Sequence, residues 1–558
     1  MKSVVVLGLV WALTLLAASL FASAAVVEHT FQVGNFTVER LCNPLVITAV
    51  NESLPGPTIE VREGDTLVVN VLNSSPYNIT IHWHGIFQFL SAWADGPEFV
   101  TQCGIPPASN YTYKFNITGQ EGTLWWHAHS SNIRATVYGA LIIHPQNGNS
   151  YPFTEPDEEL PPILFGEWWN HNVVDLEKEA DESGDSFPEP DAYTINGLPE
   201  TFQLSVSQGK TYLMRIINSA LNKQLFFKIA NHNFTVVAID AAYTDQYTTD
   251  VIVAAPGHTV DVLFTANQPV GSYYMAASPY QTLNGTFDIP TRGILAYENS
   301  TSASPLNVTM PITNDTDTAH KFYTNITGLA GGPHWVPVPL DVDESMFITF
   351  GLGLASCPNC TFGASGQRLS ASMNNESFVL PRGRGLSMLE AFYQNETGVY
   401  TKDFPDNPPL EFDYTNPNVS NGDQRLAFAP KSTKVKTLKF NSTVQVVLQN
   451  TAILAVENHP MHIHGFNFHI LAQGFGNYNA TKDEPTFNLV NPQIRNTIAV
   501  PVGGWAVIRF ITNNPGIWLV HCHFDAHVPW GLAMAFEVEN GPTTETTLPP
   551  PPADLPKC

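Results

Sequence analysis

The residues best suited to chemistry are histidines, which gather at four places in the chain. Ten of the 18 histidines fall in tight clusters: His82/His84, His127/His129, His459/His462/His464 and His521/His523/His527. On a β-strand, residues i and i+2 share a face, so each His-x-His motif presents two imidazoles in one direction. Four such pairs provide eight imidazoles, more than the three or four ligands of a zinc site. Imidazole-rich sites suit copper, and eight imidazoles could hold three ions of low coordination number.

One cysteine indicates a second kind of site. Cys522 lies between two histidines of the last cluster, so its side chain must point away from the face on which those imidazoles lie. There it can meet His459 and His527 in a His₂Cys arrangement, which is typical of blue-copper electron-transfer sites. The axial position would face Leu532, ten residues after the cysteine. Leucine has no donor atom, so this copper would be three-coordinate and its reduction potential would be high. Electrons could leave this copper along the covalent path through Cys522.

The single histidines and the tryptophan pairs are interpreted as packing residues. A single histidine on an apolar strand is usually a hydrogen-bonded core residue. This interpretation applies to His144, His171, His232, His258 and His469. The tryptophan pairs at 125–126 and 168–169 are expected to pack as well, although Trp126 directly precedes a proposed ligand.

The elements that must position these motifs are short β-strands. Runs of five or six residues with alternating apolar side chains recur between turn residues, and this alternation is the strand signal. The clearest runs cover residues 66–71, 211–216, 259–264 and 506–510. With 43 Pro, 38 Gly and few long amphipathic stretches, the chain is expected to be mostly β and folded as sandwiches.

Two stretches depart from this pattern, and one feature repeats. The acidic stretch 175–191 is interpreted as a solvated loop with room for a short helix, and residues 300–340, rich in Pro, Asn, Thr and Gly, as a linker.

The histidine motifs near residues 82 and 462 are each followed, about 45 to 60 residues later, by a second His-x-His. This repetition indicates that the first and last domains are similar units.

Composition limits the classes of function. The 558 residues include 50 acidic and 25 basic side chains, for a formal net charge of −25, and 43% are hydrophobic. The length suggests about three or four domains, and the apolar fraction excludes a wholly disordered chain. The negative charge, with no Lys/Arg cluster to offset it, argues against a nucleic-acid partner.

The N-terminus predicts export. Met1-Lys2, an apolar run over 4–20 and then Ala22-Ser23-Ala24 are typical of a secretory signal peptide, with an uncleaved membrane anchor as the alternative. Eighteen N-x-S/T sequons, spread from Asn35 to Asn479, indicate N-linked glycans. We therefore expect a secreted, soluble glycoprotein that has no membrane contact after signal cleavage.

The cysteines leave the disulfide pattern open. The six are Cys42, Cys103, Cys357, Cys360, Cys522 and Cys558. With Cys522 assigned to a metal, five remain, and five cannot all pair within one chain.

Four segments together resemble the copper signatures of the multicopper oxidases. They are HWHG at 82–85, GTLWWHAH at 122–129, HPMHIHG at 459–465 and HCHFDAHVPWGL at 521–532. Within that family the chain is similar to the plant laccases, through RATVYGA at 134–140, NTIAVP at 496–501 and the closing DLPKC at 554–558. The likeness runs from about residue 30 to the C-terminus.

The resemblance implies three cupredoxin-like Greek-key β-sandwich domains, with a copper cluster between the first and the third. We place the signal peptide at 1–24, the domains at 25–147, 148–302 and 341–558, and the linker at 303–340. The implied cofactor is copper, as four ions: one type 1, one type 2 and two type 3.

The resemblance also maps the ligands of the family onto eleven residues. Type 1 copper would take His459, Cys522 and His527, with Leu532 as its axial neighbour, and type 2 copper would take His82 and His462. The type 3 pair would take His84, His127 and His523 on one side, and His129, His464 and His521 on the other.

Two carboxylates match positions at which the family delivers protons to bound oxygen. They are Asp95, in WADGP, and Asp525, inside the last signature. Reduction of O₂ to water needs four protons, so buried carboxylates near the cluster would serve as general acids. For Asp95 the alternative is an Asx-type turn before Gly96-Pro97.

The resemblance further implies a bridge that ties the tail, at Cys558, to Cys103. The middle-domain cysteine that plant laccases usually pair with the position of Cys42 is absent, because no cysteine lies between 103 and 357. Cys42 is therefore expected to be the odd thiol. Cys357 and Cys360 could close a tight ring or stay reduced.

The implied activity is that of a secreted laccase of the cell wall, or apoplast, acting as a monomer. Phenols such as monolignols or flavonoids would each lose one electron, and O₂ would be reduced to water. The alternatives are an ascorbate oxidase, a ferroxidase and a non-catalytic copper-binding protein of the wall. Leu532, where methionine is typical, argues against the first, and the complete ligand set argues against the last. A ferroxidase would need an acidic site beside the type 1 copper.

Overall fold

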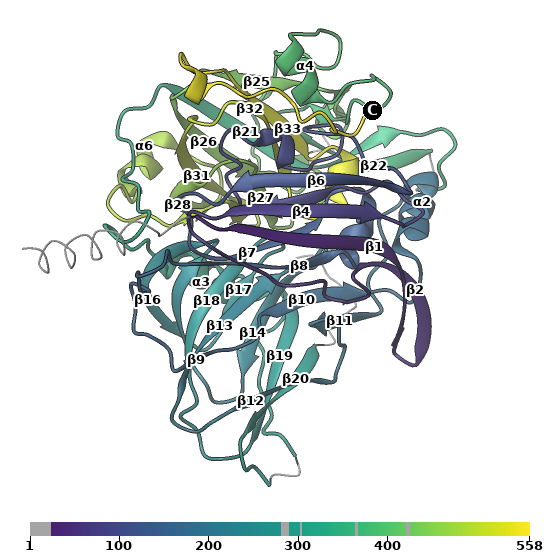
Figure 1. Ribbon diagram of the computed structural model, residues 1–558. Coiled ribbons are helices and arrows are strands. Elements are labelled where there is room, and N and C mark those ends of the chain that lie inside the picture. The colour runs from purple at the N-terminus through teal and green to yellow at the C-terminus, as the bar shows by residue number, and fades with distance from the viewer. Residues whose placement is uncertain (1–23, 281–289, 302–303, 363–365, 420–423) are drawn as a thin grey trace, which may run out of the picture.

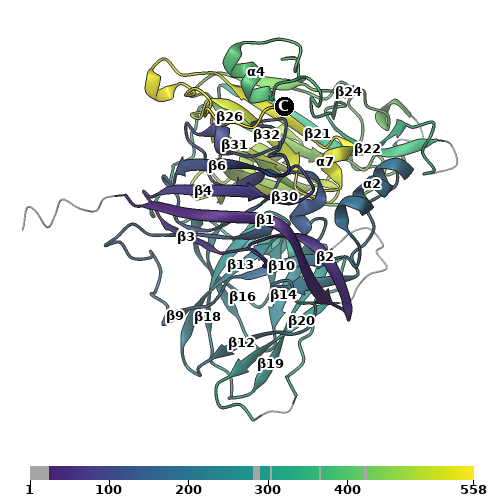
Figure 2. The same cartoon turned by 45° about the vertical axis from the view of Figure 1, so that its right-hand side comes forward.

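Strands dominate the architecture, which is built from three β-sandwiches (Figure 1). The structure is a computed structural model that describes residues 24–280, 290–301, 304–362, 366–419 and 424–558. The expected signal peptide, apart from residue 24, lies outside the described residues. In Figures 1 and 2 the N-terminal sheets, in purple, lie between the teal middle sandwich and the yellow-green C-terminal sandwich. The expected mostly β, cupredoxin-like fold is confirmed.

The first sandwich pairs two four-stranded sheets, β2-β1-β4-β6 and β3-β8-β7-β5. Strand β1 runs parallel to β4 and antiparallel to β2. Strand β4 alternates between buried and more exposed residues, which is the pattern of a strand with one face on the core. The strands are β1 (Val26–Arg40), β2 (Asn43–Val50), β3 (Ile59–Arg62), β4 (Thr66–Asn73), β5 (Ile81–His84), β6 (Ser109–Asn116), β7 (Gly122–Ala128) and β8 (Tyr138–His144).

The middle sandwich pairs a sheet ordered β11-β10-β13-β18-β15-β16, with β9 beside β13, and a sheet ordered β12-β20-β19-β14-β17. The strands of the first sheet are β9 (Glu158–Glu159), β10 (Ile163–Trp168), β11 (Ala192–Ile195), β13 (Thr211–Asn218), β15 (Phe234–Ile239), β16 (Ala242–Thr249) and β18 (Thr259–Thr265). Those of the second are β12 (Phe202–Val206), β14 (Gln224–Ile229), β17 (Ile252–Ala254), β19 (Ser272–Tyr280) and β20 (Thr291–Tyr297).

The third sandwich pairs a sheet ordered β22-β21-β26-β31-β28-β29 with one ordered β25-β33-β32-β27-β30, and β23 pairs with β24 beside them. The strands of the first sheet are β21 (Glu344–Ser356), β22 (Gln367–Met373), β26 (Thr443–Asn450), β28 (Phe468–Phe475), β29 (Ile494–Arg495) and β31 (Gly504–Ile511). The others are β23 (Ser377–Phe378), β24 (Lys431–Ser432), β25 (Val435–Leu438), β27 (His459–Ile463), β30 (Thr497–Val500), β32 (Gly516–Cys522) and β33 (Ala533–Val538).

Helices are short and lie between strands. The α-helices are α2 (Val173–Ser183), α3 (Thr316–Asn325), α4 (Met388–Gln394), α6 (Ala480–Asp483) and α7 (His527–Trp530). The 3₁₀ turns are η1 (Ala92–Ala94), η2 (Ser131–Ala135), η3 (Gln424–Leu426), η4 (Glu484–Thr486) and η5 (Thr544–Thr546).

The short helix that the acidic stretch had room for is present, whereas the expected linker needs correction. Much of the acidic stretch 175–191 forms α2, because Asn172 caps its first turn by accepting a hydrogen bond from the backbone of Val174 and Gly184 ends it at a φ of 79°. The segment 303–340 is more than a linker, since it contains α3. Phe322 and Tyr323 of α3 pack into the core of the middle sandwich.

The four clearest sequence runs are confirmed as strands, within β4, β13, β18 and β31. Their apolar residues build two main cores. One belongs to the middle sandwich, whereas the other is continuous across the first and third sandwiches. The histidine motifs at the ends of β5, β7, β27 and β32 therefore rest on a shared core.

The expected bridge between Cys103 and Cys558 is present, and it joins residues 455 positions apart. The tail is further held by a hydrogen bond of 2.8 Å from the Trp93 indole to the carbonyl of Pro549. The open question about Cys357 and Cys360 is settled in favour of a disulfide. Cys42 is an exposed free thiol, as expected.

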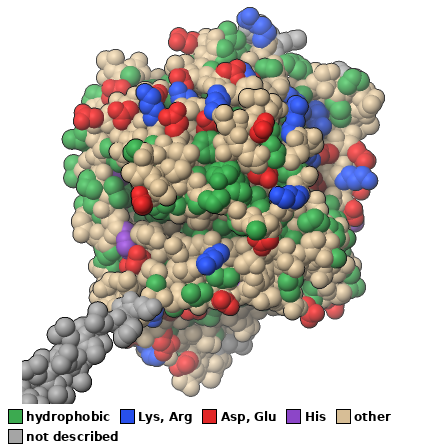
Figure 3. All heavy atoms as spheres, turned by 45° about the horizontal axis from the view of Figure 1, so that its top comes forward, with side chains coloured by type: hydrophobic (Ala, Val, Ile, Leu, Met, Phe, Trp, Pro, Cys, Tyr) green, Lys and Arg blue, Asp and Glu red, His purple; other side chains and the backbone are tan. Residues whose placement is uncertain are grey.

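No helix in the described part of the chain is long and apolar enough to cross a bilayer. The face seen in Figure 3 carries acidic and basic side chains interspersed, with apolar side chains between them.

Candidate metal centres

A buried trio of donor atoms lies where strand β32 ends. The Sγ of Cys522 lies 3.6 Å from Nδ1 of His459 and 3.4 Å from Nδ1 of His527. His459 begins the adjacent strand β27, and His527 begins α7 just after β32. The three donor atoms lie within 4.8 Å of one another and all three residues are buried. This is a His₂Cys set, which suits copper.

Two buried residues lie next to this trio, one along the chain and one across the sheet. Leu532 is held at the turn into β33, because the Cys522 N–H donates to its carbonyl at 3.1 Å and its own N–H donates to the carbonyl of His527 at 3.0 Å. Met461 lies directly opposite Cys522 in the antiparallel pair of β27 and β32. Opposed residues of such a pair share a face. Leu532 has no donor atom, whereas Met461 carries a thioether.

Strand register brings the four His-x-His motifs together. His82 of β5 lies opposite His127 of β7, and His462 of β27 lies opposite His521 of β32. The second histidine of each motif follows two residues later, on the same face. One strand pair belongs to the first sandwich and the other to the third, so the eight imidazoles meet between these sandwiches.

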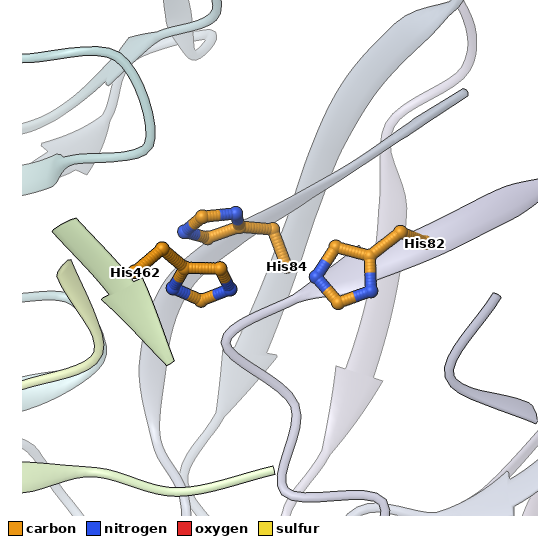
Figure 4. A group of neighbouring side chains, drawn as sticks. All are labelled: His82, His84 and His462. Carbon is orange, nitrogen blue, oxygen red and sulfur yellow. The ribbon is translucent and has the colours of Figure 1, made fainter. Parts of the chain in front are cut away.

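The eight imidazoles form three groups of three, two of which share His84, and the donor atoms of each group lie within 4.8 Å of one another. The groups are His82/His84/His462, His84/His127/His523 and His129/His464/His521. In Figure 4 the rings of His84 and His462 face each other, and their centroids are 3.9 Å apart. His84 Nδ1 lies 3.0 Å from His523 Nε2, and the Nε2 atoms of His464 and His521 are 3.1 Å apart. The second and third groups coincide with the type 3 sets expected from the sequence.

The hydrogen bonds of these histidines fit a bound metal. Nδ1 of His82, His127 and His462 lies 2.7, 2.9 and 2.8 Å from the backbone carbonyls of Asp95, Ala128 and Asn496. An Nδ1–H that donates to a carbonyl leaves the lone pair on Nε2. Within the described residues, the Nε2 atoms of these three histidines are buried without a hydrogen-bond partner. Buried, unpartnered acceptors that converge on one point are what a metal cluster requires.

Burial also keeps the imidazoles in their metal-binding form. It lowers the pKa of His521 and of His459 to about 3. Seven more pKa values fall well below the usual value, first through burial and also through neighbouring imidazoles. They belong to His84, His127, His129, His462, His464, His523 and His527. Burial raises the pKa of the Cys522 thiol. Such a thiol becomes a thiolate when it binds a metal ion.

Asp95 is completely buried against the histidine cluster. Its carboxylate oxygens lie 3.3 Å from Nδ1 of His82 and 2.9 Å from Nδ1 of His464. Both oxygens therefore face imidazoles, which argues against the alternative of an Asx-type turn. A carboxylate on the outer nitrogen of a ligand orients the ring and raises its basicity.

Arg134 links Asp525 to the histidine cluster. The Arg134 guanidinium, which is buried, lies 3.1 Å from the Asp525 carboxylate and 3.0 Å from Nδ1 of His523. Burial raises the pKa of Asp525 to about 6, against the opposing effect of Arg134. A carboxyl group with this pKa holds its proton at mildly acidic pH. Arg134 was not singled out from the sequence, because only the fold brings it to His523.

Glu457 is a second residue that sequence reasoning missed. Its carboxylate lies 3.3 Å from Nε2 of His527 and 3.9 Å from Nε2 of His459, on the edge of both rings that faces away from Cys522. Burial raises its pKa to about 7. The signal in the sequence was its position, two residues before His459.

Trp125, rather than Trp126, faces the cluster, with ring centroids 5.3 Å from His84 and 4.3 Å from His127.

The single histidines mostly behave as expected. His144, His232, His258 and His469 make hydrogen bonds within the fold. His171 is instead exposed, so its interpretation as a packing residue was wrong.

Three segments of the chain, residues 32–148, 159–300 and 403–542, match family models described as multicopper oxidase. The chain is 59% identical to Laccase-7 of Arabidopsis thaliana and 54% identical to Laccase-24 of Oryza sativa subsp. japonica. The first alignment covers 98% of both chains, and the second covers 98% of this chain and 99% of the rice protein.

Solved structures show the same fold. The crystal structure of laccase from Botrytis aclada matches with a TM-score of 0.72 at 26% identity, over 95% of this chain and 89% of that one. Fet3p, a multicopper oxidase that functions in iron import, matches with a TM-score of 0.74 at 22% identity, over 92% of this chain and 90% of that one. At that identity the second likeness concerns the fold alone.

Proposed function

The chain belongs to the multicopper oxidase family as a laccase of the plant type, and on this premise we propose which side chains serve its copper sites. His459, Cys522 and His527 hold type 1 copper. Type 2 copper takes His82 and His462, and the type 3 pair takes the two groups His84/His127/His523 and His129/His464/His521. The unpartnered Nε2 atoms of His82, His127 and His462 support this assignment.

The proposal rests mainly on the position of Cys522 between His521 and His523. Its thiol belongs to the trio with His459 and His527, whereas the imidazoles on either side of it belong to the other cluster. Bound copper supplies one-electron redox chemistry at the first site and four-electron reduction of O₂ to water at the second. The backbone around Cys522 gives electrons a short covalent route between the sites, and the buried rings exclude water from it.

Two carboxylates serve proton delivery in this proposal. Asp525 presents an oxygen, Oδ2, that has no hydrogen-bond partner among the described residues, and Arg134 holds its other oxygen. Asp95 orients His82 and His464 and lies within the cluster itself. A general acid with a pKa near the working pH is the most effective kind, and Asp525 meets that condition in mildly acidic surroundings.

We further propose that phenols approach the type 1 trio from the side of Glu457. This carboxylate is partly exposed and lies at the outer edge of both type 1 histidines, so it can accept a hydrogen bond from a phenolic O–H while the ring lies close to His459 or His527. No group of three potential metal ligands among the described residues includes Glu457. A single carboxylate at this edge suits a hydrogen bond from a phenolic O–H, and the substrate panel below separates phenols from ferrous iron.

The setting that we propose is the plant cell wall. The N-terminal apolar run and the sequons support secretion into the apoplast with N-linked glycans on the chain. We assign the three domains to residues 25–147, 148–302 and 341–558.

Oxygen uptake with a substrate panel tests the proposal. Purified copper-loaded protein is expected to consume O₂ with monolignols or flavonoids, at one O₂ per four one-electron oxidations, and to act poorly on ascorbate and ferrous iron. The chain with Cys522→Ser is expected to lose the blue absorption together with phenol oxidation. Faster turnover of ascorbate or Fe²⁺ than of every phenol would contradict the assignment.

A further inference from the structure

A cavity of about 270 Å³ connects the histidine cluster to the surface. Its lining includes the buried imidazole of His127, the half-buried imidazole of His129 and the exposed side chain of Arg382. Because deeply buried and exposed residues line the same space, the cavity reaches from one to the other. Asp525 also lines it, together with two carboxylates that the reaction described above does not use, Glu98 and Glu177.

The two additional carboxylates come from different sandwiches and meet at one turn. Glu177 lies on α2, which Figures 1 and 2 place beside β22. Its Oε2 accepts hydrogen bonds from the Ser131 hydroxyl and, at 3.1 Å, from the Asn132 N–H. The carboxylate of Glu98, from the loop after η1, interacts with the side chain of Ser130, which lowers the pKa of Glu98. These three partner residues directly follow the proposed ligand His129, so both carboxylates lie against the segment that positions it.

The carboxylates interact electrostatically with one another. Burial raises the pKa of both Glu98 and Glu177. The negative charge of Glu177 further raises the pKa of Glu98, and it acts in the same direction on Asp525. Glu177 is therefore close enough to influence both of the other carboxylates in the cavity.

Other charged groups around the cavity also shift the pKa values of Glu98 and Glu177, but they do not reverse the upward shift. Arg382 lowers the pKa of both glutamates, whereas Asp181, one turn further along α2, raises that of Glu177. Asp181 is itself paired with Arg368 at 2.8 Å, and Lys431 also lines the cavity. The net shift of both glutamates is upward. They therefore retain protons at a higher pH than exposed glutamates would.

We propose that Glu98 and Glu177 form a proton-loading pair that collects protons from bulk water and passes them along the cavity toward Asp525 during O₂ reduction. This inference rests on the proposed function. Each O₂ takes up four electrons and four protons and leaves as two waters, while four phenols release four electrons and four protons at the type 1 side. In each transfer the Glu177 carboxyl group gives its proton to water in the cavity, and the carboxylate is then reprotonated from bulk solvent.

A purely structural role is the competing interpretation, because Glu177 also ties α2 to η2 through Ser131 and Asn132. Glu177→Gln separates the two roles. The amide oxygen of glutamine can still accept these hydrogen bonds, but glutamine cannot carry a proton. Glu179→Gln is the matched control, since Glu179 is exposed on the same helix.

The kinetic test follows each half-reaction separately by stopped flow in the copper-loaded protein. Glu177→Gln and Glu98→Gln are each expected to slow reoxidation by O₂ about threefold to tenfold near neutral pH, with a smaller deficit at acidic pH. Reduction of the type 1 copper by phenol is expected to stay unchanged, and Glu179→Gln to resemble the unaltered enzyme. Equal reoxidation rates in all variants would overturn the proposal, as would parallel loss of both half-reactions. Failure of the unaltered enzyme to oxidise phenols would instead reject the proposed function.

The second test needs no turnover. Infrared difference titration of the copper-depleted protein is expected to show protonated carboxyl bands that are missing in Glu98→Gln and in Glu177→Gln. In Glu177→Gln the band of Glu98 should titrate at lower pH, because a neighbouring negative charge has been removed. An unchanged midpoint for Glu98 would show that the two groups do not interact, and the pair would then be rejected.

Discussion

Replacing Leu532 by methionine tests how the type 1 copper is tuned. Leu532 is fully buried and is fixed beside the trio by its hydrogen bonds to Cys522 and His527. If its side chain occupies the axial position, the copper has three strong ligands and Cu(I) is favoured over Cu(II). A thioether there donates weakly to Cu(II), so the reduction potential of Leu532→Met should fall.

The size of the effect can be bounded. A fall of ~60 mV in a one-electron couple corresponds to ~1.4 kcal/mol and weakens the equilibrium for phenol oxidation about tenfold. Leucine and methionine have similar volumes, so the substitution should change the free energy of unfolding by under ~1.5 kcal/mol even at this buried position. The blue colour should persist, because it depends on the thiolate of Cys522. A loss of activity in this variant would then reflect the potential rather than the fold.

Redox titration of the blue absorption measures the potential directly. Met461→Leu is the matched control, since Met461 lies opposite Cys522 on the same face of the sheet. This second variant should leave the potential nearly unchanged if Leu532 is the axial neighbour. The reasoning would be refuted by an unchanged potential in Leu532→Met together with a raised potential in Met461→Leu. Met461 would then be the axial ligand.

The remaining predictions concern protons, substrate and the tail. Asp525→Asn and Asp95→Asn should each slow reoxidation by O₂ by about a hundredfold, the lower limit for a lost general acid, while phenol still reduces the blue copper in stopped flow. Loss of copper, measured by metal analysis, would point to a structural defect instead. Glu457→Gln should raise the KM for phenols severalfold and leave the reoxidation rate unchanged; an unaltered KM across the panel would exclude Glu457 from the substrate site. Cys103→Ser with Cys558→Ser opens a loop of 455 residues, for which the chain-entropy model gives an upper limit of ~6 kcal/mol in unfolding free energy. Denaturant midpoints equal to those of the unaltered protein would show that packing of the tail alone holds it.

Most of the candidate metal site could be found from the sequence, because the pattern that brings its residues together is local. The spacing i, i+2 puts both imidazoles of each motif on one strand face, and Cys522 on the other, whatever the fold around them. The strands themselves followed from alternation, as in residues 66–71. The bounds of helix α2 were not predicted, because an acidic composition concealed its capping residues, Asn172 and Gly184. Arg134, Glu177 and Glu457 could not be assigned from the sequence, since their roles arise from contacts that only the tertiary structure makes.

Both copper sites depend on one register, that of β27 against β32. Met461 faces Cys522 and His462 faces His521 in this pair, so a shift of β32 by one residue would turn every side chain to the opposite face. The thiol would then enter the cluster of imidazoles, and His521 would leave it. The hydrogen bond from the Cys522 N–H to the Leu532 carbonyl resists such a shift, because it ties the end of β32 to the residue before β33. The two sites are therefore coupled by backbone pairing as well as by the covalent path of electrons, and a change that disturbs this hairpin should disable both sites together.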